Sequence, residues 1–304
     1  MSIISFDGVC KSFASRKVLD QLSFSVERAQ VYGLLGPNGC GKSTAINILC
    51  SLLDPDSGTV RIGDTASKDS RHSLGYCPQE IALYRDLTPS ENLRFFAEIQ
   101  GLSPSGRKRR VDALTQQLGL ARHDRTPVGA LSGGWQRRVS IAAALIHEPE
   151  VIILDEPTAA VDLEARHELW GLIETLRGGG TTILLTTHHL DEAERLCSRI
   201  GIMRDGCIAK EGSVEELLAV VPGKMVATVA SSEESAIAKR AGERGWGVRR
   251  YAGKLACLLP EATTLNAVVD VFRGIDVSAA SLQKVSLEHA FLEVVHQGSW
   301  KIDG

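Results

Sequence analysis

Short uninterrupted runs of apolar residues recur in the first two thirds of the chain, and each run ends in polar or charged residues. The clearest runs are residues 31–35, 151–154 and 182–185. Runs of this length predict strands buried on both faces, as in a parallel sheet covered by helices. Between the first two runs, apolar positions recur at helical spacing over about residues 87–147. The pattern therefore predicts an α/β core that is interrupted by a helical subdomain.

The pattern changes after Pro222-Gly223. From residue 225 to residue 282, short segments follow in the order β-α-β-β-α-β, and a last helix is expected over 286–295. This order suits a small α+β sandwich of the ferredoxin-like kind. We therefore expect two domains, residues 1–222 and 223–304. The second shows no catalytic constellation, so regulation or support of a dimer is its expected role.

A glycine-rich segment lies between the apolar run at 31–35 and a helix expected over 44–51. Residues 36–43 fit the pattern G-x-x-x-x-G-K-[ST], in which backbone N–H groups curl around phosphate oxygens and a lysine completes the cradle. A tight turn that needs positive φ is the ordinary alternative for such a segment. The strand and helix around it instead favour a phosphate-binding loop, the P-loop of ATPases. Its expected binding residues are Gly36, Pro37, Asn38, Gly39, Cys40, Gly41, Lys42, Ser43 and Thr44.

Two adjacent carboxylates, Asp155 and Glu156, end the apolar run at 151–154. Charged residues at the end of a buried strand are costly unless a cation or a reacting group uses them. In a nucleotide site the first carboxylate can hold Mg²⁺ together with Ser43, while the second orients and deprotonates the attacking water. We therefore expect ATP hydrolysis with Glu156 as the base and with Lys42 on the phosphates. A solvated strand end is the alternative.

A further motif narrows the class of ATPase. Leu131-Ser132-Gly133-Gly134, followed by Gln136-Arg137-Arg138, resembles the signature sequence of ABC ATPases, and the resemblance covers nearly all of residues 1–220. It implies a head-to-tail dimer in which Ser132, Gly133 and Gly134 reach the γ-phosphate of the ATP on the other subunit. Read alone, the segment could also be a helix start capped by Ser132. Trp135 stands where the family most often has glutamine. The change affects the usual side-chain contact of that glutamine and leaves the backbone contacts of the signature in place.

Other family positions follow from the resemblance one at a time. Phe13 resembles the aromatic that stacks on adenine, although a core aromatic at a strand end is an alternative. Gln79 is similar to the glutamine that touches Mg²⁺ and the attacking water. Asp162 resembles the loop aspartate that communicates across the dimer. His188 matches the histidine that contacts the γ-phosphate and steadies the catalytic carboxylate. His189 has no Cys or His at ligand spacing, so we expect a surface residue rather than a metal ligand.

Composition limits the setting of this activity. The chain has 304 residues, is 43% hydrophobic and carries a formal charge of −3, which argues against nucleic acid as a partner. Its seven cysteines include no C-x-x-C pair, which indicates a reducing, cytosolic compartment. No apolar run approaches the length of a membrane helix and no signal peptide is evident. Any transport path is therefore expected in another chain.

These expectations combine into one function. The segment from Ser286 to Phe291 resembles the terminal helix of ATPase chains from ABC drug, lipid and polysaccharide exporters. The resemblance implies an ATPase subunit, dimeric with itself or with a paired ATPase, docked on the cytoplasmic face of a membrane permease encoded separately. A soluble ABC ATPase that acts mechanically in translation or DNA repair is the alternative. Such proteins carry tandem cassettes or long coiled coils, whereas this chain has one cassette and no heptad run.

Overall fold

The computed structural model describes residues 2–251 and 253–296. The chain divides into two compact units, Met1–Glu211 and Gly212–Gly304. Helix α7 (Val214–Leu218) belongs to the second unit, in which it packs against the last helix, α10 (Leu287–His296). The division therefore falls before α7, whereas the sequence pattern placed it after residue 222.

The first unit contains the predicted parallel sheet. Its strand order is β10-β9-β3-β8-β7-β6, and β3 pairs in parallel with β8 and β9, as does β7 with β6 and β8. Thr186 stands opposite both Leu34 and Asp155, so the carboxyl ends of three strands are level. The bounds are β3 (Val31–Leu35), β6 (Leu74–Cys77), β7 (Val151–Asp155), β8 (Thr182–Thr186), β9 (Arg199–Arg204) and β10 (Cys207–Gly212).

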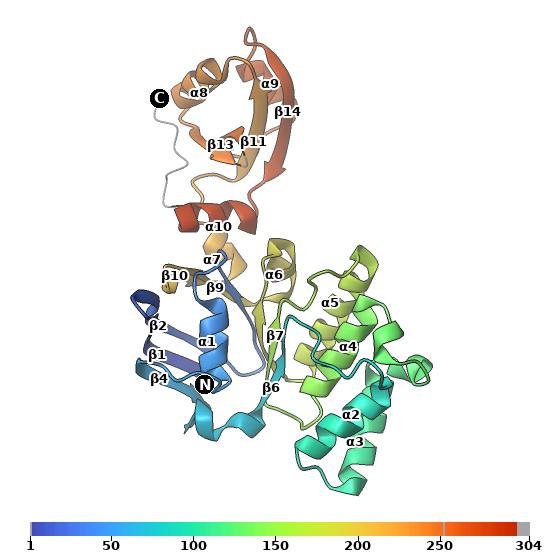
Figure 1. The fold of residues 1–304 in the computed structure, drawn as a ribbon. Helices are drawn as coiled ribbons and strands as arrows, with labels where there is room; N and C mark the ends of the chain where they lie inside the picture. The colour runs from blue at the N-terminus through green and yellow to red at the C-terminus, as the bar shows by residue number, and fades with distance from the viewer. Residues whose placement is uncertain (1, 252, 297–304) are drawn as a thin grey trace. The chain divides into compact units, whose positions relative to one another are not determined.

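A second, antiparallel sheet in the same unit has the order β2-β1-β4-β5. Figure 1 shows its strands (blue) beside α1 (Lys42–Leu49), the helix that follows the glycine-rich loop. Side chains from this sheet, from α1 and from the parallel sheet share one hydrophobic core, in which the rings of Phe6, Phe24 and Tyr32 stack. The bounds are β1 (Ser2–Phe13), β2 (Arg16–Glu27), β4 (Ser57–Ile62) and β5 (Thr65–Ala66).

The expected helical subdomain lies between β6 and β7. Thr88 and Glu91 form a capping box at the start of its first helix, and Pro89 occupies the first turn, where no backbone donor is lost. The fully buried Asn92 bonds the backbone of Tyr84 in both directions, which fastens the preceding loop to the helix. The bounds are α2 (Pro89–Ile99), α3 (Pro104–Gln117), η3 (Leu120–His123), η4 (Val128–Ala130) and α4 (Gly133–Ala144), with α5 (Leu163–Gly178) and α6 (Leu190–Leu196) after β7 and β8. No helix among residues 2–251 and 253–296 is long and apolar enough to cross a bilayer.

The second unit has the β-α-β-β-α-β element order that we expected of a ferredoxin-like sandwich. Its sheet runs β12-β13-β11-β14 with antiparallel neighbours. Helices α8 and α9 pack on one face of it, because Ile237, Ala241, Val268 and Phe272 share a core with alternate residues of β11 and β13. The bounds are β11 (Met225–Ser231), α8 (Glu234–Glu243), β12 (Gly247–Tyr251), β13 (Lys254–Leu259), α9 (Leu265–Val271) and β14 (Val277–Lys284).

Polar contacts join α10 to this sheet. Arg249 and Glu293 form a largely buried ion pair, with Nε 2.6 Å from Oε1, and the Tyr251 hydroxyl donates to the same carboxylate. The buried His289 accepts hydrogen bonds at Nδ1 from the N–H and the hydroxyl of Ser286. A ring nitrogen that accepts carries no proton, so this geometry requires the neutral imidazole.

We expect His289 to make the stability of the fold dependent on pH. Burial lowers the pKa of His289 below its ordinary value of 6.5. The unfolded chain then binds more protons below that pH, so the contribution of the neutral ring is present above it and is lost as pH falls toward the folded pKa. His289→Gln should reduce the free energy of unfolding in urea by about 1 kcal/mol at about pH 8, and by less at about pH 5. A difference that does not change with pH would contradict this assignment.

Candidate functional site

The glycine-rich loop connects the end of β3 to the start of α1, as predicted. Gly41 adopts φ of 111°, and a Cβ atom there would lie 2.6 Å from Leu19 Cδ2 and 2.9 Å from the carbonyl oxygen of Val18. Only glycine allows the loop to pass this close to β2. Lys42 is the first residue of α1, and its Nζ donates to the carbonyl oxygens of Gly36 at 2.6 Å and Pro37 at 3.2 Å. The ammonium group is therefore held over the loop, where a phosphate would meet it.

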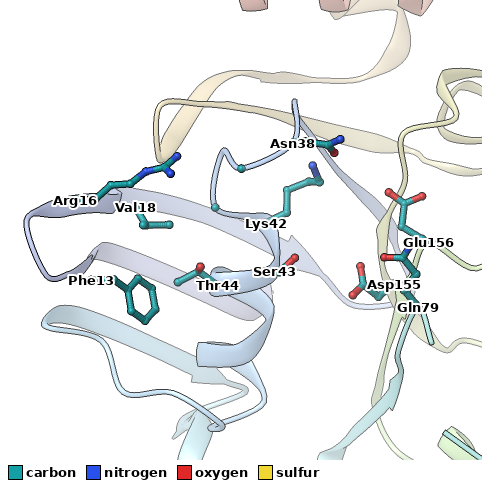
Figure 2. A pocket seen from close by; sticks show the side chains of 12 residues that line it. Phe13, Arg16, Val18, Asn38, Lys42, Ser43, Thr44, Gln79, Asp155 and Glu156 are labelled. Atoms are coloured by element: carbon teal, nitrogen blue, oxygen red, sulfur yellow. The ribbon is translucent and has the colours of Figure 1, made fainter. Parts of the chain in front are cut away.

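Asp155 ends β7, and its carboxylate is oriented from two neighbouring strands. The Thr186 hydroxyl on β8 donates to Oδ1, and the Tyr76 hydroxyl on β6 donates to Oδ2 at 3.4 Å. Burial and the nearby Asp155 raise the pKa of Tyr76, so this phenol remains a donor. Asp155 and Gln79 line one side of a cleft, and Ser43 lies across from them (Figure 2). Hydroxyl, carboxylate and amide oxygens of this kind suit a hard divalent cation such as Mg²⁺.

Glu156 follows directly and is joined to His188. Its Oε2 lies 2.5 Å from His188 Nδ1, and the His188 backbone N–H donates to the same oxygen at 3.4 Å. An ionised carboxylate only accepts, so Nδ1 carries the proton in this pair. Glu156 is also one of the non-glycine residues with positive φ, at 48°. Its N–H donates to the Thr186 carbonyl oxygen at 3.0 Å, which anchors the unusual backbone from one side.

The cleft has a volume of about 370 Å³ and contains most of the predicted site residues. Figure 2 shows Lys42, Ser43 and Thr44 between the two carboxylates and Phe13. Phe13 ends β1 and is 49% exposed, so it is not the core aromatic that was the alternative. The predicted residues that line the cleft are Phe13, Asn38, Gly39, Gly41, Lys42, Ser43, Thr44, Gln79, Asp155 and Glu156.

Arg16 and Val18 also line the cleft, and sequence reasoning did not single them out. Both lie on β2, and Arg16 pairs with Phe13 across the β1–β2 hairpin. Arg16 extends toward the loop, because a Cβ atom at Gly39 would lie 3.7 Å from its Nη2. An arginine close after a candidate adenine-stacking residue was the available signal. Its position offers a guanidinium to a phosphate at the loop.

The signature residues do not line this cleft. Ser132 and Gly133 are exposed at the N-terminus of α4, and the Ser132 side chain makes no capping hydrogen bond, unlike the helix-start alternative. Asp162 caps α5 by accepting from the Ala165 N–H at 2.9 Å, and Gly134 packs against the same turn. These residues therefore form a separate surface from the P-loop within one subunit.

Trp135, the unusual residue of the signature, is held inside its own subunit. The guanidinium carbons of Arg122 and Arg138 lie 4.2 Å and 4.6 Å from the centroid of its ring, and the His123 ring is 4.4 Å away. Cation–π contacts on an indole fix its orientation. Trp135 therefore ties the start of α4 to η3.

His189 is half-buried rather than on the surface as we had expected, and its ring lies 4.1 Å from that of His188. Burial lowers the pKa of His189, which favours the neutral ring next to the Glu156–His188 pair. Among residues 2–251 and 253–296, no cluster of three or more His, Cys, Asp or Glu side chains could hold a metal ion.

Comparison with known proteins gives consistent matches. Residues 19–159 match the family described as "ABC transporter". The chain is 35% identical to the daunorubicin resistance ATP-binding protein DrrA3 of Streptomyces coeruleorubidus, over 96% of this chain and 95% of that one. It is 40% identical to the Nod factor export ATP-binding protein I of Ralstonia nicotianae, over 71% and 68% of the two chains. A dimeric ATP-binding cassette solved in a post-hydrolysis state with ADP and phosphate superposes with a TM-score of 0.60 at 26% identity, over 69% of this chain and 98% of that one.

Proposed function

This chain belongs to the ABC transporter family and is an ATP-hydrolysing subunit of such a transporter, and from that premise we propose that it powers export through a separate membrane permease. The observation that carries the proposal is a cleft lined both by the P-loop and by the carboxylates Asp155 and Glu156, of which Glu156 is paired with His188. Relatives named for export and for drug resistance support the direction of transport. In this arrangement the permease binds the substrate, and this chain supplies the ATPase activity.

In the proposed reaction, the backbone of the P-loop and Lys42 bind the phosphates of ATP, and Phe13 stacks on the adenine. Ser43, Gln79 and Asp155 would hold Mg²⁺, which when bound neutralises charge on the phosphates. Glu156 accepts the proton of the attacking water, and Gln79 orients that water. His188 donates to Glu156 from Nδ1, and with both ring nitrogens protonated its Nε2–H would donate to an oxygen of the γ-phosphate. Because positioning and charge stabilisation dominate phosphoryl transfer, these contacts are the contribution of one subunit to hydrolysis.

We further propose that the working form is a dimer with two shared ATP sites. Ser132 and Gly133 are exposed and have no role in the cleft of their own subunit. The N–H groups at the start of α4 would instead meet the γ-phosphate held by the P-loop of a partner. Asp162, beside them, would contact the partner subunit. The second unit would support or regulate this dimer.

The subunit is proposed to work on the cytoplasmic face of the membrane, docked on its permease. Copurification tests this directly. A tagged chain extracted in mild detergent should bring down a multi-span membrane protein, and Lys42→Ala, which leaves the docking surface intact, should bring it down equally. A chain that instead fractionates with ribosomes or DNA-repair complexes would support the mechanical ABC ATPase and overturn the transport proposal.

A further inference from the structure

The side chain of Arg137 is an unusual feature of the first unit. It lies on α4, five residues after Ser132, and is only 2% exposed. No carboxylate within residues 2–251 and 253–296 forms an ion pair with it, whereas the neighbouring Arg138 pairs with Glu168. A buried charge must be compensated by good hydrogen bonds, so the role of this guanidinium is inferred from the groups that it bonds.

Those partners come from two catalytic segments. Arg137 Nη1 donates to the Pro78 carbonyl oxygen at 2.5 Å. Its Nη2 donates to the carbonyl oxygen of Gln79 at 2.7 Å and to that of Glu156 at 3.2 Å. One rigid fork thus joins the backbone of the residue expected to orient the water to the backbone of the expected base. Lysine could not reproduce this, because an ammonium lacks the planar, spread donors of a guanidinium.

The hydrogen bond from Arg137 to the Glu156 carbonyl oxygen stabilises an unfavourable backbone conformation. A non-glycine residue at φ of 48° persists only where its surroundings determine it. The Glu156 N–H is held by Thr186 on β8, and its carbonyl oxygen is held by Arg137. Fixing both sides of the residue fixes the direction in which its carboxylate leaves the chain.

We propose that Arg137 is a positioning residue, which holds Gln79 and Glu156 in their hydrolytic arrangement from the helix that opens with the signature. The inference rests on the proposed function, because it assigns a hydrogen-bond donor to Gln79 and Glu156, which orient and deprotonate the water there. Arg137 touches neither nucleotide nor water in this role. Its loss should therefore lower the rate of hydrolysis and leave nucleotide binding at Lys42 and the P-loop nearly unchanged.

The test compares Arg137→Gln and Arg137→Lys with the control Arg28→Gln, which removes the same charge from an exposed ion pair with Glu150. Turnover, KM for ATP, affinity for a fluorescent ATP analogue and the thermal unfolding midpoint are measured for each. Arg137→Gln should lower kcat by about tenfold or more with affinity changed less than about twofold. Arg137→Lys should recover only part of kcat, and Arg28→Gln should resemble the wild type.

A double-mutant cycle separates positioning from general support of the fold. If Arg137 acts through Glu156, Arg137→Gln should slow the residual hydrolysis of a Glu156→Gln variant much less than it slows the wild type. Equal losses in both backgrounds would overturn the proposal. So would a proportional fall in affinity and kcat, or failure of both Arg137 variants to fold, since Arg137 would then serve the whole unit. Normal turnover in Glu156→Gln alone would instead remove the base assigned under the proposed function.

Discussion

Glu156→Gln is expected to bind ATP as the wild type does and to hydrolyse it about 10²-fold more slowly or worse. The amide cannot accept a proton from water at neutral pH, whereas its size and its contact with the His188 backbone N–H can be retained. ATP affinity should be preserved because the phosphates are bound by the P-loop and Lys42, on the other side of the cleft (Figure 2).

The measurement is steady-state phosphate release beside equilibrium binding of a fluorescent ATP analogue. Glu150→Gln is a suitable control, because Glu150 lies at the opposite end of β7 and forms an exposed ion pair with Arg28. Lys42→Ala should show the reverse pattern, with weakened binding, since its charge meets the phosphates in the ground state. Near-normal turnover in Glu156→Gln would assign the base to another group.

Two inactive variants are expected to restore hydrolysis when they are mixed. Lys42→Ala disables a P-loop, and Gly133→Asp places a carboxylate where the signature would meet the γ-phosphate. In a mixed dimer both lesions fall in one shared site and leave the other site intact. Random mixing should therefore recover about a quarter of the wild-type turnover, if one site works alone.

Gly133 is a better position for this lesion than Gly134. A Cβ atom at Gly134 would lie 2.7 Å from Ala165 Cβ, so a side chain there would force α4 away from α5. At Gly133 the nearest atom is the Ala160 carbonyl oxygen at 3.7 Å, and an acidic residue in the first turn is favourable for a helix. Loss of activity in Gly133→Asp can then be read as an effect at the shared site.

Crosslinking tests the shared site without the condition that one site works alone. Asn38→Cys and Ser132→Cys are placed on separate chains, both positions being exposed. ATP-dependent crosslinks between unlike chains are expected in a Glu156→Gln background, with the parent chain as the control for native thiols. Dimers that crosslink only without ATP, or not at all, would contradict the shared-site proposal.

The sequence predicted much of the fold where a short-range pattern and a chemical requirement coincide. The strand over 31–35 has the predicted bounds, and those over 151–154 and 182–185 extend by one residue to Asp155 and Thr186. Each run is buried on both faces, which leaves an uninterrupted apolar signal. The loop after β3 could be predicted from its glycines, because few other residue types can adopt the backbone conformation that the loop requires.

The interactions between distant segments could not be predicted in this way. Arg137 stands in a Gln-Arg-Arg run that has the composition of a solvated helix face, and only the fold brings carbonyls from two loops around it. The Trp135 stack depends on Arg122 in a separate 3-10 turn. Thr186 orients Asp155 from a neighbouring strand, which requires the strand order and the register. The spacing of apolar residues within one segment does not predict contacts of this kind.

The left-handed backbone of Glu156 also bears on how this protein can be engineered. A non-glycine residue in that conformation costs about 1–2 kcal/mol, and glycine or asparagine would relieve part of that cost. A selection for thermal resistance alone would therefore favour replacing this residue, as happens at strained active sites in which stability and activity compete. Thermostable variants of this subunit should be chosen with position 156 held constant, because a gain there would come with a transporter that binds ATP and cannot use it.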